Sequence, residues 1–577
     1  MEELQVLPLE PLDYAAFGAF FVILSLIGYW SGRNERKTSK EYFLADRKLP
    51  WYVVGSSFIV ANISSEHFIG MVGAGLIYGI CAGMACWANV ATFTFLIWFF
   101  IPFLLASKVY TTPEFLQCRY NSILRHSFAI VTILTNIVAF LAAVLYGGTL
   151  ALQTLFDWPF WPTIIILGLV AGIWAIYGGL SSVAWASIPT VIIMIGGGVL
   201  VTILGLYWLS GDSHSFIDGF KIMIERNQAN EGIYAEVVAQ TSQQITHQDT
   251  YNRLSVIQPN SHELMPWGGL LLSIFTISIW YNALNQFMIQ SVLGAKNSYH
   301  ARMGIVLAGF IQIVLPIVIV MPGLIFFAKY PEVMKLPWNE LRPQADKTWI
   351  FMVQKIIPVG LKGLVLAALF GAIQSTVNAV VNSTATVFTM DIYKRILHRN
   401  GTDKHYVKVG IISSIVVLVV SIILGGFINK LSNSLFVYIQ TLYAFFAPPF
   451  AAIFLLGILW RRINAIGAMT AVIFGFVFGI LLKLYIHLFP SHYILLEPFM
   501  NQAAINWALC IIVCIVTSLC TAPPRPDQIT DNLVCNWKNL NIFHELGNRW
   551  YTSIIFWWSL FALTVIGIII LLSGIFV

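Results

Sequence analysis

Charged side chains are scarce in this chain of 577 residues. Asp, Glu, Lys and Arg together make up 10% of the sequence, whereas 58% of the residues are hydrophobic. A soluble domain carries about 25% charged residues, because its surface must be solvated. The composition therefore excludes an ordinary soluble protein and indicates one polytopic helical bundle in a membrane.

Metal-binding, disulfide and catalytic motifs are also missing. The seven cysteines lie mostly in or beside apolar segments and show neither disulfide nor metal-ligand spacing. We find no nucleophile triad, phosphate-binding loop, zinc spacing or nucleic-acid signature. Because no acid, base and nucleophile converge within the apolar segments, we expect no enzyme, and we expect no nucleic acid among the partners.

Long apolar runs are what the sequence does contain. Windows of about 20 residues predict an all-α membrane protein. About fourteen transmembrane helices are expected, at 14–31, 51–80, 83–107, 125–153, 158–177, 181–209, 266–292, 303–328, 362–392, 409–428, 434–460, 463–483, 503–522 and 552–576. A tight glycine turn at 176–182 should separate the fifth helix from the sixth.

The distribution of Lys and Arg predicts the orientation, because short loops that carry these residues stay in the cytoplasm. Basic residues gather in the loop after the first span and in alternate loops from there on. Segment 211–264 lies on the other side and holds seven acidic residues against three basic ones. We therefore predict a multi-pass protein of the cell membrane, plasma or inner, with both termini outside.

Residues 50–82 are apolar but have a polar centre that runs from Asn62 to His67. A charge at the bilayer centre costs ~2.5–3.5 kcal/mol on insertion scales, so an ionisable residue there predicts a functional site. Glu66 and His67 are the adjacent ionisable pair in this centre. Flanking glycines favour a helix that is interrupted between Asn62 and Glu66 and that exposes backbone carbonyls.

A second apolar stretch, 273–291, also has a polar centre, formed by Ser278, Tyr281, Asn282, Asn285 and Gln286. It begins five predicted spans after the first polar-centred stretch. Two interrupted helices at matching positions of two five-helix blocks are typical of an inverted-repeat symporter. The predicted parts are 1–50 (extra N-terminal helix and cytoplasmic loop), 51–462 (transport core: first repeat 51–210, extracellular loop 211–264, second repeat 265–462) and 463–577 (accessory helices).

Ala372, Ser375 and Thr376 stand at i, i+3 and i+4 of a predicted helix, so one carbonyl and two hydroxyls share a face. Such oxygen atoms suit sodium, with further carbonyls from a broken helix. The alternative is that both hydroxyls bond back to their own helix.

Three more residues have open roles. His67 is a hydrogen-bond donor to a solute, a proton site or an interhelical contact. Tyr281 either closes an aromatic gate or packs, and Gln440 either binds solute or makes an interhelical hydrogen bond.

Several motifs together carry a resemblance. The strings YTTPEF, AIYGGLSSV, NQFMIQ, NSTATVFTMDIYK and YIQTLYAFFAPPF, with the 45–75 segment, resemble the sodium/solute symporter family in its sodium/glucose and sodium/galactose branch. The likeness covers nearly all of residues 14–522. It implies a fourteen-helix LeuT-type fold with an inverted five-helix repeat, and alternating access driven by an inward sodium gradient.

The resemblance also implies two sets of site residues. The sodium site maps onto the backbone carbonyls of Val60, Ile63 and Ala372 and the hydroxyls of Ser375 and Thr376. The solute site takes Tyr281 as its inner gate and Asn62, His67, Cys86, Ser278, Gln312 and Gln440 as its other residues.

The chain departs from the galactose-type pattern at several positions. Cys86 stands where a Glu is common, and Ser278 and Gln312 replace an Asn and a Lys. Because a buried site discriminates through such hydroxyl-binding groups, hexose specificity does not carry over. Ser187 and Ser291 replace an Asp and an Arg, a paired loss that leaves no unpaired buried charge. One sodium per solute is the resulting hypothesis.

The sequence therefore predicts a sodium-coupled symporter for a small neutral polar solute, a sugar or polyol, with sodium as the co-transported ion. A monocarboxylate symporter would need a basic group in the site, and His67 is its one candidate. A sodium-gated sensor or channel with the same fold is the other alternative. The lipid bilayer is the expected surrounding, and the sequence leaves a homo-oligomer open.

Overall fold

The computed structural model describes residues 9–33, 38–156, 158–428, 435–489, 495–536 and 544–573. These residues form helices and no strand; a single isolated bridge pairs Leu49 with Ala295. Within them, twelve helices are long and apolar enough to cross a membrane. They are Pro11–Gly32, Ile80–Ala106, Ser122–Gln153, Ala175–Ser213, Trp267–Leu284, Ser298–Lys329, Leu361–Leu397, Asp403–Gly425, Tyr438–Leu459, Ala465–Leu488, Phe499–Cys520 and Ile554–Leu571.

Two predicted spans fall outside these twelve. The first is the polar-centred segment, which the structure divides into α3 (Trp51–Asn62), the π-helix η3 (Glu66–Met71) and α4 (Val72–Tyr78). The second is the shorter apolar helix Phe160–Ile173. An all-helical membrane architecture is confirmed, while the count of fourteen stays a prediction.

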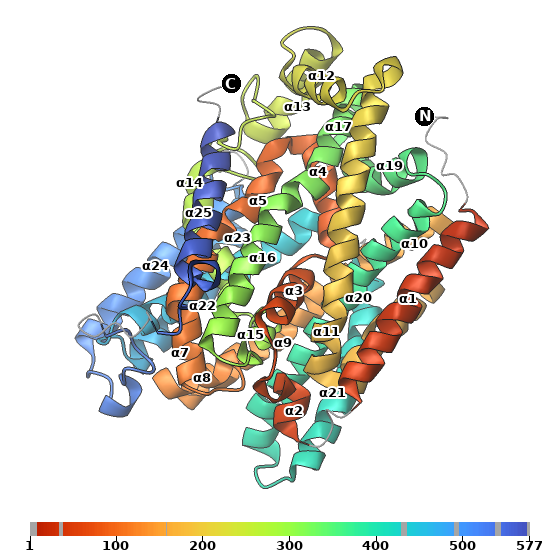
Figure 1. Cartoon of the computed structure of the whole chain (residues 1–577). Helices are drawn as coiled ribbons and strands as arrows, with labels where there is room; N and C mark the ends of the chain where they lie inside the picture. Colours follow the sequence, from red (N-terminus) through yellow and green to blue (C-terminus); the bar gives the residue numbers. More distant parts are fainter. Residues whose placement is uncertain are drawn as a thin grey trace.

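The bundle in Figure 1 is built from helices that pack side by side. The helices before the middle of the chain are α1 (Pro11–Gly32), α5 (Met84–Trp87), α6 (Asn89–Phe95), α7 (Ile101–Ala106), α8 (Thr112–Arg119), α9 (Ser122–Thr135), α10 (Ala142–Phe156), α11 (Phe160–Ser210), α12 (Phe216–Gln228), α13 (Gly232–Thr246) and α14 (Trp267–Ser273). Those after it include α15 (Gln286–Leu293), α16 (Ser298–Ile319), α18 (Trp338–Ala345), α20 (Leu361–Val387), α21 (Asp403–Gly425), α22 (Leu435–Leu459), α23 (Ala465–Leu488), α24 (Phe499–Cys520) and α25 (Ile554–Leu571).

The glycine turn predicted at 176–182 is confirmed inside α11, which continues across a kink at Gly179. Gly179 has φ 57° and ψ −149°, a backbone conformation that residues with a side chain rarely adopt. A Cβ there would lie 2.3 Å from the carbonyl oxygen of Tyr42. The turn therefore requires glycine both for its backbone angle and for the close approach of the segment around Tyr42.

The first interrupted helix is confirmed between Asn62 and Glu66. Ile63 is extended, with φ −89° and ψ 119°, directly after the last residue of α3. Local side chains replace the missing helical bonds: the Ser64 hydroxyl accepts the Glu66 N–H at 3.2 Å, and the His67 Nδ1 accepts the Ser64 N–H at 3.4 Å. Ser64 and His67 therefore hold the break open by satisfying its backbone donors.

The second interruption lies at Asn285. The π-helix η9 (Trp280–Leu284) ends there, Asn285 is extended with φ −69° and ψ 126°, and α15 follows. In Figure 1, α14 lies toward the end of the bundle that carries α12 and α13, whereas α15 lies toward the end that carries α8. We refer to these as the α12 end and the α8 end.

Segment 211–264, the predicted extracellular loop, contains the helices α12 and α13. The start of α1 and the end of α25 lie toward the same end of the bundle as these helices (Figure 1). The start of α1 and the end of α25 are thus on one side, and the assignment of that side to the outside stays a prediction.

Residues 247–266 are hydrogen-bonded to the last turn of α4. Arg253 is fully buried, and its guanidinium donates to the carbonyls of Leu76 at 2.7 Å and Ile77 at 2.8 Å. These are terminal carbonyls that the helix itself leaves unpaired. Glu263 from the same segment pairs with Arg342 of α18 and accepts the Tyr78 hydroxyl at 3.0 Å. The α12 end is therefore closed by charged and polar contacts.

Candidate functional site

A cleft of oxygen atoms lies where α20 meets the first helix break. The Thr376 hydroxyl lies 3.3 Å from the carbonyl oxygen of Val60 and 3.2 Å from that of Ile63, and the Ala61 carbonyl is 3.5 Å away. Because Ile63 is extended, these carbonyls have left the hydrogen-bond pattern of α3. We call Val60, Ile63 and Thr376 the oxygen cleft; such neutral oxygens suit a hard monovalent cation.

Ser375 and Ala372 extend this arrangement along α20. The Ser375 hydroxyl lies 3.4 Å from the hydroxyl of Ser187, which itself donates to the Val183 carbonyl at 2.9 Å. Ala372 is fully buried one turn before Thr376. Among the described residues, neither the Ser375 nor the Thr376 hydroxyl bonds back to its own helix, so that alternative does not hold in this conformation.

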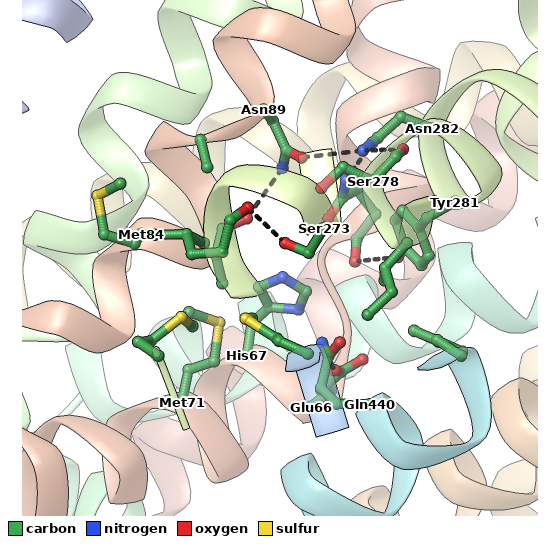
Figure 2. Close-up of a pocket in the computed structure, with 18 residues that line it drawn as sticks. Glu66, His67, Met71, Met84, Asn89, Ser273, Ser278, Tyr281, Asn282 and Gln440 are labelled. Atoms are coloured by element: carbon green, nitrogen blue, oxygen red, sulfur yellow. Dashed lines mark hydrogen bonds between the residues drawn. The ribbon is translucent and has the colours of Figure 1, made fainter. Parts of the chain in front are cut away.

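A cavity of about 70 Å³ lies next to the oxygen cleft. It is lined by both interrupted helices and by neighbouring spans (Figure 2). Of the predicted solute residues, it brings together Asn62, His67, Ser278, Tyr281 and Gln440. Cys86 and Gln312 contact each other instead and are not part of the lining.

A chain of amides organises one wall of the cavity. The Asn62 Nδ2 donates to the Asn282 Oδ1 at 3.3 Å, and the Asn282 Nδ2 donates to the Asn89 Oδ1 at 3.1 Å. The Asn89 Nδ2 in turn donates to the Ala85 carbonyl at 3.0 Å. Figure 2 shows the bond between Asn89 and Asn282. The linked amides hold one another in place, which preorganises this wall.

Tyr281 connects the cavity to the first break. Its hydroxyl donates to the Asn62 carbonyl at 3.4 Å. Its ring centroid lies 5.5 Å from that of Tyr443 and 5.8 Å from that of Phe287, and Phe140 packs against all three. Because Phe287 belongs to α15, this aromatic cluster lies on the α8 side of the cavity.

Two ionisable groups face the cavity from the π-helix η3. Glu66 is 5% exposed and accepts the Gln440 Nε2 through its Oε1 at 3.3 Å. His67 is 7% exposed and uses its Nδ1 to accept the Ser64 N–H. The Nε2 of His67 therefore carries the hydrogen and remains available as a donor.

Several cavity residues lie outside the sequence-based assignment. They include Met71, Met84, Asn89, Ser273 and Tyr443. The sequence could have indicated Asn89, because it is a lone amide in the apolar stretch 83–107. The methionines carried no such signal, because apolar residues within spans are ordinarily packing.

The described residues include no cluster of three or more His, Cys, Asp or Glu that could hold a metal ion. The oxygen cleft is of a different kind, since it is built from backbone carbonyls and a hydroxyl. Neutral oxygens of this kind suit sodium, and a site without a carboxylate allows a transported ion to leave.

Comparisons with known proteins identify the family of the chain. A model of the sodium:solute symporter family matches residues 42–475. The sodium/glucose cotransporter of Vibrio parahaemolyticus is 31% identical over 549 residues, which cover 92% of this chain and 95% of that protein. The sodium/myo-inositol cotransporter of Mus musculus is 29% identical over 560 residues, covering 92% of this chain and 76% of that protein.

A solved structure of a symporter shares the fold. It is the substrate-bound, outward-open state of a Na⁺-coupled sialic acid symporter, with a TM-score of 0.70 at 19% identity. The superposition covers 89% of this chain and 99% of that one. On the family match and the 31% identity to a cotransporter over most of its length, the chain belongs to the sodium:solute symporter family and is a multi-pass membrane transporter whose co-transported ion is sodium.

Proposed function

We propose that the protein imports a small neutral polar solute, a sugar or polyol, together with sodium by alternating access. The observation that carries the proposal is that one helix break contributes both to the oxygen cleft and to the lining of the cavity. Val60 and Ile63 supply carbonyls to the oxygen cleft, while Asn62 between them directs its side chain to the cavity. The sugar and inositol cotransporters among the relatives support the solute class.

The proposed sodium site consists of Val60, Ile63, Ala372, Ser375 and Thr376. In the structure, the Thr376 hydroxyl donates toward the carbonyls that would ligate the ion. Sodium entering the cleft replaces this hydrogen bond with ion–oxygen contacts from both α3 and α20. The break becomes more ordered, Asn62 is fixed for the solute, and by linkage each ligand raises the affinity for the other.

The proposed solute site consists of Asn62, His67, Ser278, Tyr281 and Gln440, with Cys86 and Gln312 joining when the cavity widens. Tyr281 acts as the gate toward the α8 end, because it lies between the cavity and the aromatic cluster. The linked amides and the His67 Nε2 supply donors and acceptors that a hydroxylated solute can use.

The transport cycle requires that the two ends of the cavity open in turn. We propose that Trp51–Tyr78 and Phe160–Ile173 complete fourteen spans, and that 51–210 and 265–462 are inverted repeats around the two breaks at Ile63 and Asn285. Residues 1–50 and 463–577 would then be accessory parts. The basic loops place the α8 end in the cytoplasm and both termini outside.

The monocarboxylate alternative is disfavoured by charge. The cavity lining contains the carboxyl group of Glu66 and neither Lys nor Arg. An anionic solute would therefore find no guanidinium or ammonium partner there, which is unfavourable in a buried site.

Ligand-induced stabilisation of the purified protein tests the proposal. A ligand that binds the folded state raises the melting temperature. We expect sodium, compared with equal potassium, to raise it, and myo-inositol, D-glucose or D-galactose to raise it further in sodium only. Equal melting temperatures in sodium and potassium would contradict the proposed sodium site, and a solute effect independent of sodium would favour a sensor or an uncoupled pathway.

A further inference from the structure

The polar groups of the cavity differ in how much of their hydrogen-bonding capacity is already taken up within the protein. The amide nitrogens of Asn62, Asn89 and Asn282 donate to one another or to the Ala85 carbonyl. The Tyr281 hydroxyl donates to the Asn62 carbonyl. These groups shape the wall, but most of their donors are engaged before a solute arrives.

Glu66 differs from these groups. The residue is 5% exposed, and among the described residues its carboxyl group has one hydrogen-bond partner, the Gln440 Nε2 at 3.3 Å. Glu66 takes part in none of the ion pairs of the described residues, and the cavity lining contains no Lys or Arg. A carboxylate has about four acceptor positions on its two oxygens, so most of its capacity is unused.

A buried carboxyl group with so few partners favours a ligand that brings hydrogen-bond donors. Leaving a buried acceptor unpaired costs free energy, and more so for a charged one. Two hydroxyls on neighbouring carbons can donate to the two oxygens of one carboxylate. The Nε2 of His67, the next residue, can donate to the oxygen of such a hydroxyl.

The rest of the lining indicates how a solute lies. Met71, Met84, Met265, Leu270 and Met500 form an apolar wall without hydrogen-bond donors. In Figure 2, Met71 and Met84 lie on one side and Tyr281 and Asn282 on the other, with His67 and Glu66 between them. A ring with hydroxyls at its edge and C–H groups on its face fits this division, since methionine packs readily against irregular apolar surfaces.

We propose that Glu66 is a solute-binding residue that selects solutes with two adjacent hydroxyl groups, and that Gln440 positions its carboxyl group. The inference rests on the proposed function and narrows its solute class to vicinal diols. Cys86 stands where the galactose-type pattern has a Glu, and it lies outside the cavity lining. The cavity nevertheless has an acidic group for hydroxyls, because Glu66 of the π-helix η3 supplies a carboxyl group.

Binding to the purified protein tests this assignment. The probes are myo-inositol and D-glucose, with D-glucosamine as an amine-bearing analogue, each titrated in sodium. The variants are Glu66→Gln, which keeps the shape, and Glu66→Asp, which keeps the charge. Glu497→Gln, at an exposed position outside the cavity, is the matched control. The sodium-induced rise in melting temperature shows that each variant is folded with its sodium site intact.

We expect Glu66→Gln to weaken binding of myo-inositol or D-glucose about 10- to 100-fold, because the amide replaces one of the two carboxyl oxygens by an NH2 group that cannot accept a hydrogen bond. The sodium-induced shift should persist, and Glu497→Gln should bind like the wild type. Polyol binding that survives Glu66→Gln would overturn the assignment of Glu66 alone. Preference of the wild type for D-glucosamine, lost in Glu66→Gln, would overturn it in favour of an ammonium-binding role. Absence of any polyol response in wild-type protein would overturn the proposed function as well.

Discussion

The oxygen cleft and the solute cavity share one helix break but are built from different atoms. The cleft takes backbone carbonyls from Val60 and Ile63 and one hydroxyl from Thr376. The cavity takes side chains from several helices, such as Asn89, Asn282 and Gln440. Carbonyls are present whatever the residue, so a cation site persists when side chains change, whereas solute choice follows the side chains. The predictions below are chosen to separate the two regions.

Removal of the cleft hydroxyl should have the largest effect. In Thr376→Ala the cleft loses the oxygen that α20 contributes opposite Val60 and Ile63. We expect sodium-driven accumulation of solute to fall at least about 10-fold, because a ligating oxygen is lost from a buried site. Uptake measured against sodium concentration checks this. Thr376→Ser keeps the oxygen and should retain most activity; equal sodium dependence in Thr376→Ala and wild type would show that the cleft is not the sodium site.

A change in the cavity should affect the solute and spare the ion. In His67→Asn the Nε2 donor is lost, while the side-chain oxygen of Asn can still accept the Ser64 N–H, so the break and the carbonyls of the cleft remain. We expect the KM for solute to rise about 10-fold, the scale of one good hydrogen bond. The half-saturating sodium concentration, measured at saturating solute, should change less than 2-fold. Gln440→Ala should behave in the same way, and a change confined to sodium affinity would contradict the division into two regions.

Ser375 and Ser187 sharpen the boundary of the cleft. Their hydroxyls are 3.4 Å apart, but only Ser375 belongs to the proposed sodium site. We expect Ser375→Ala to weaken sodium affinity several-fold and Ser187→Ala to weaken it less, because Ser187 acts only on the orientation of its neighbour. The sodium dependence of uptake for both variants distinguishes them; a larger effect in Ser187→Ala would move the site toward α11.

A smaller effect is expected at the α12 end, away from both regions. His262 lies between α13 and α14, where its Nδ1 accepts the N–H groups of Leu264 and Met265 at 3.1 and 3.0 Å. Tyr78 and Tyr251 pack against the ring, and the Sγ of Cys81 is 3.8 Å from Nε2. Burial lowers the pKa of His262 to about 3 from its usual 6.5.

In the unfolded chain, His262 therefore becomes protonated as the pH falls through about 6.5, whereas in the folded protein it stays neutral until about pH 3. The stability from neutral His262 is fully present above pH 6.5 and is lost progressively as the pH falls toward 3, by up to ~1.4 kcal/mol per pH unit. Melting temperatures from pH 7 to pH 5 should fall less steeply in His262→Asn, which keeps an acceptor, than in wild type. An equal slope in both proteins would contradict this assignment.

The backbone features were predictable from the sequence. Ser64 and His67 accept hydrogen bonds from backbone N–H groups at the first break. The polar residues in the middle of an apolar stretch predicted this break. Asn285 marks the second break within the polar centre that the sequence indicated. The meeting of Thr376 with the Val60 and Ile63 carbonyls agrees with what the family resemblance implied, although sodium binding by these atoms stays a prediction.

The side-chain environment was less predictable, because it depends on how distant helices pack. Asn89 bonds to Asn282 across 193 positions of sequence, which no local pattern reveals. Cys86 and Gln312 were assigned to the solute site by resemblance, yet in this conformation they contact each other outside the lining. A shift of the helical register by one residue changes which side chains face the cavity. The π-helices at both breaks introduce register shifts of that kind.

Sodium-driven uptake is the most direct test of the central claim that one break couples the two ligands. Wild-type protein in proteoliposomes would be given labelled D-galactose, D-glucose or myo-inositol, with and without an inward sodium gradient. The account predicts accumulation above equilibrium for at least one solute, only with the gradient, and loss of that accumulation in Thr376→Ala. Equilibration without accumulation, or accumulation that does not depend on sodium, would contradict it.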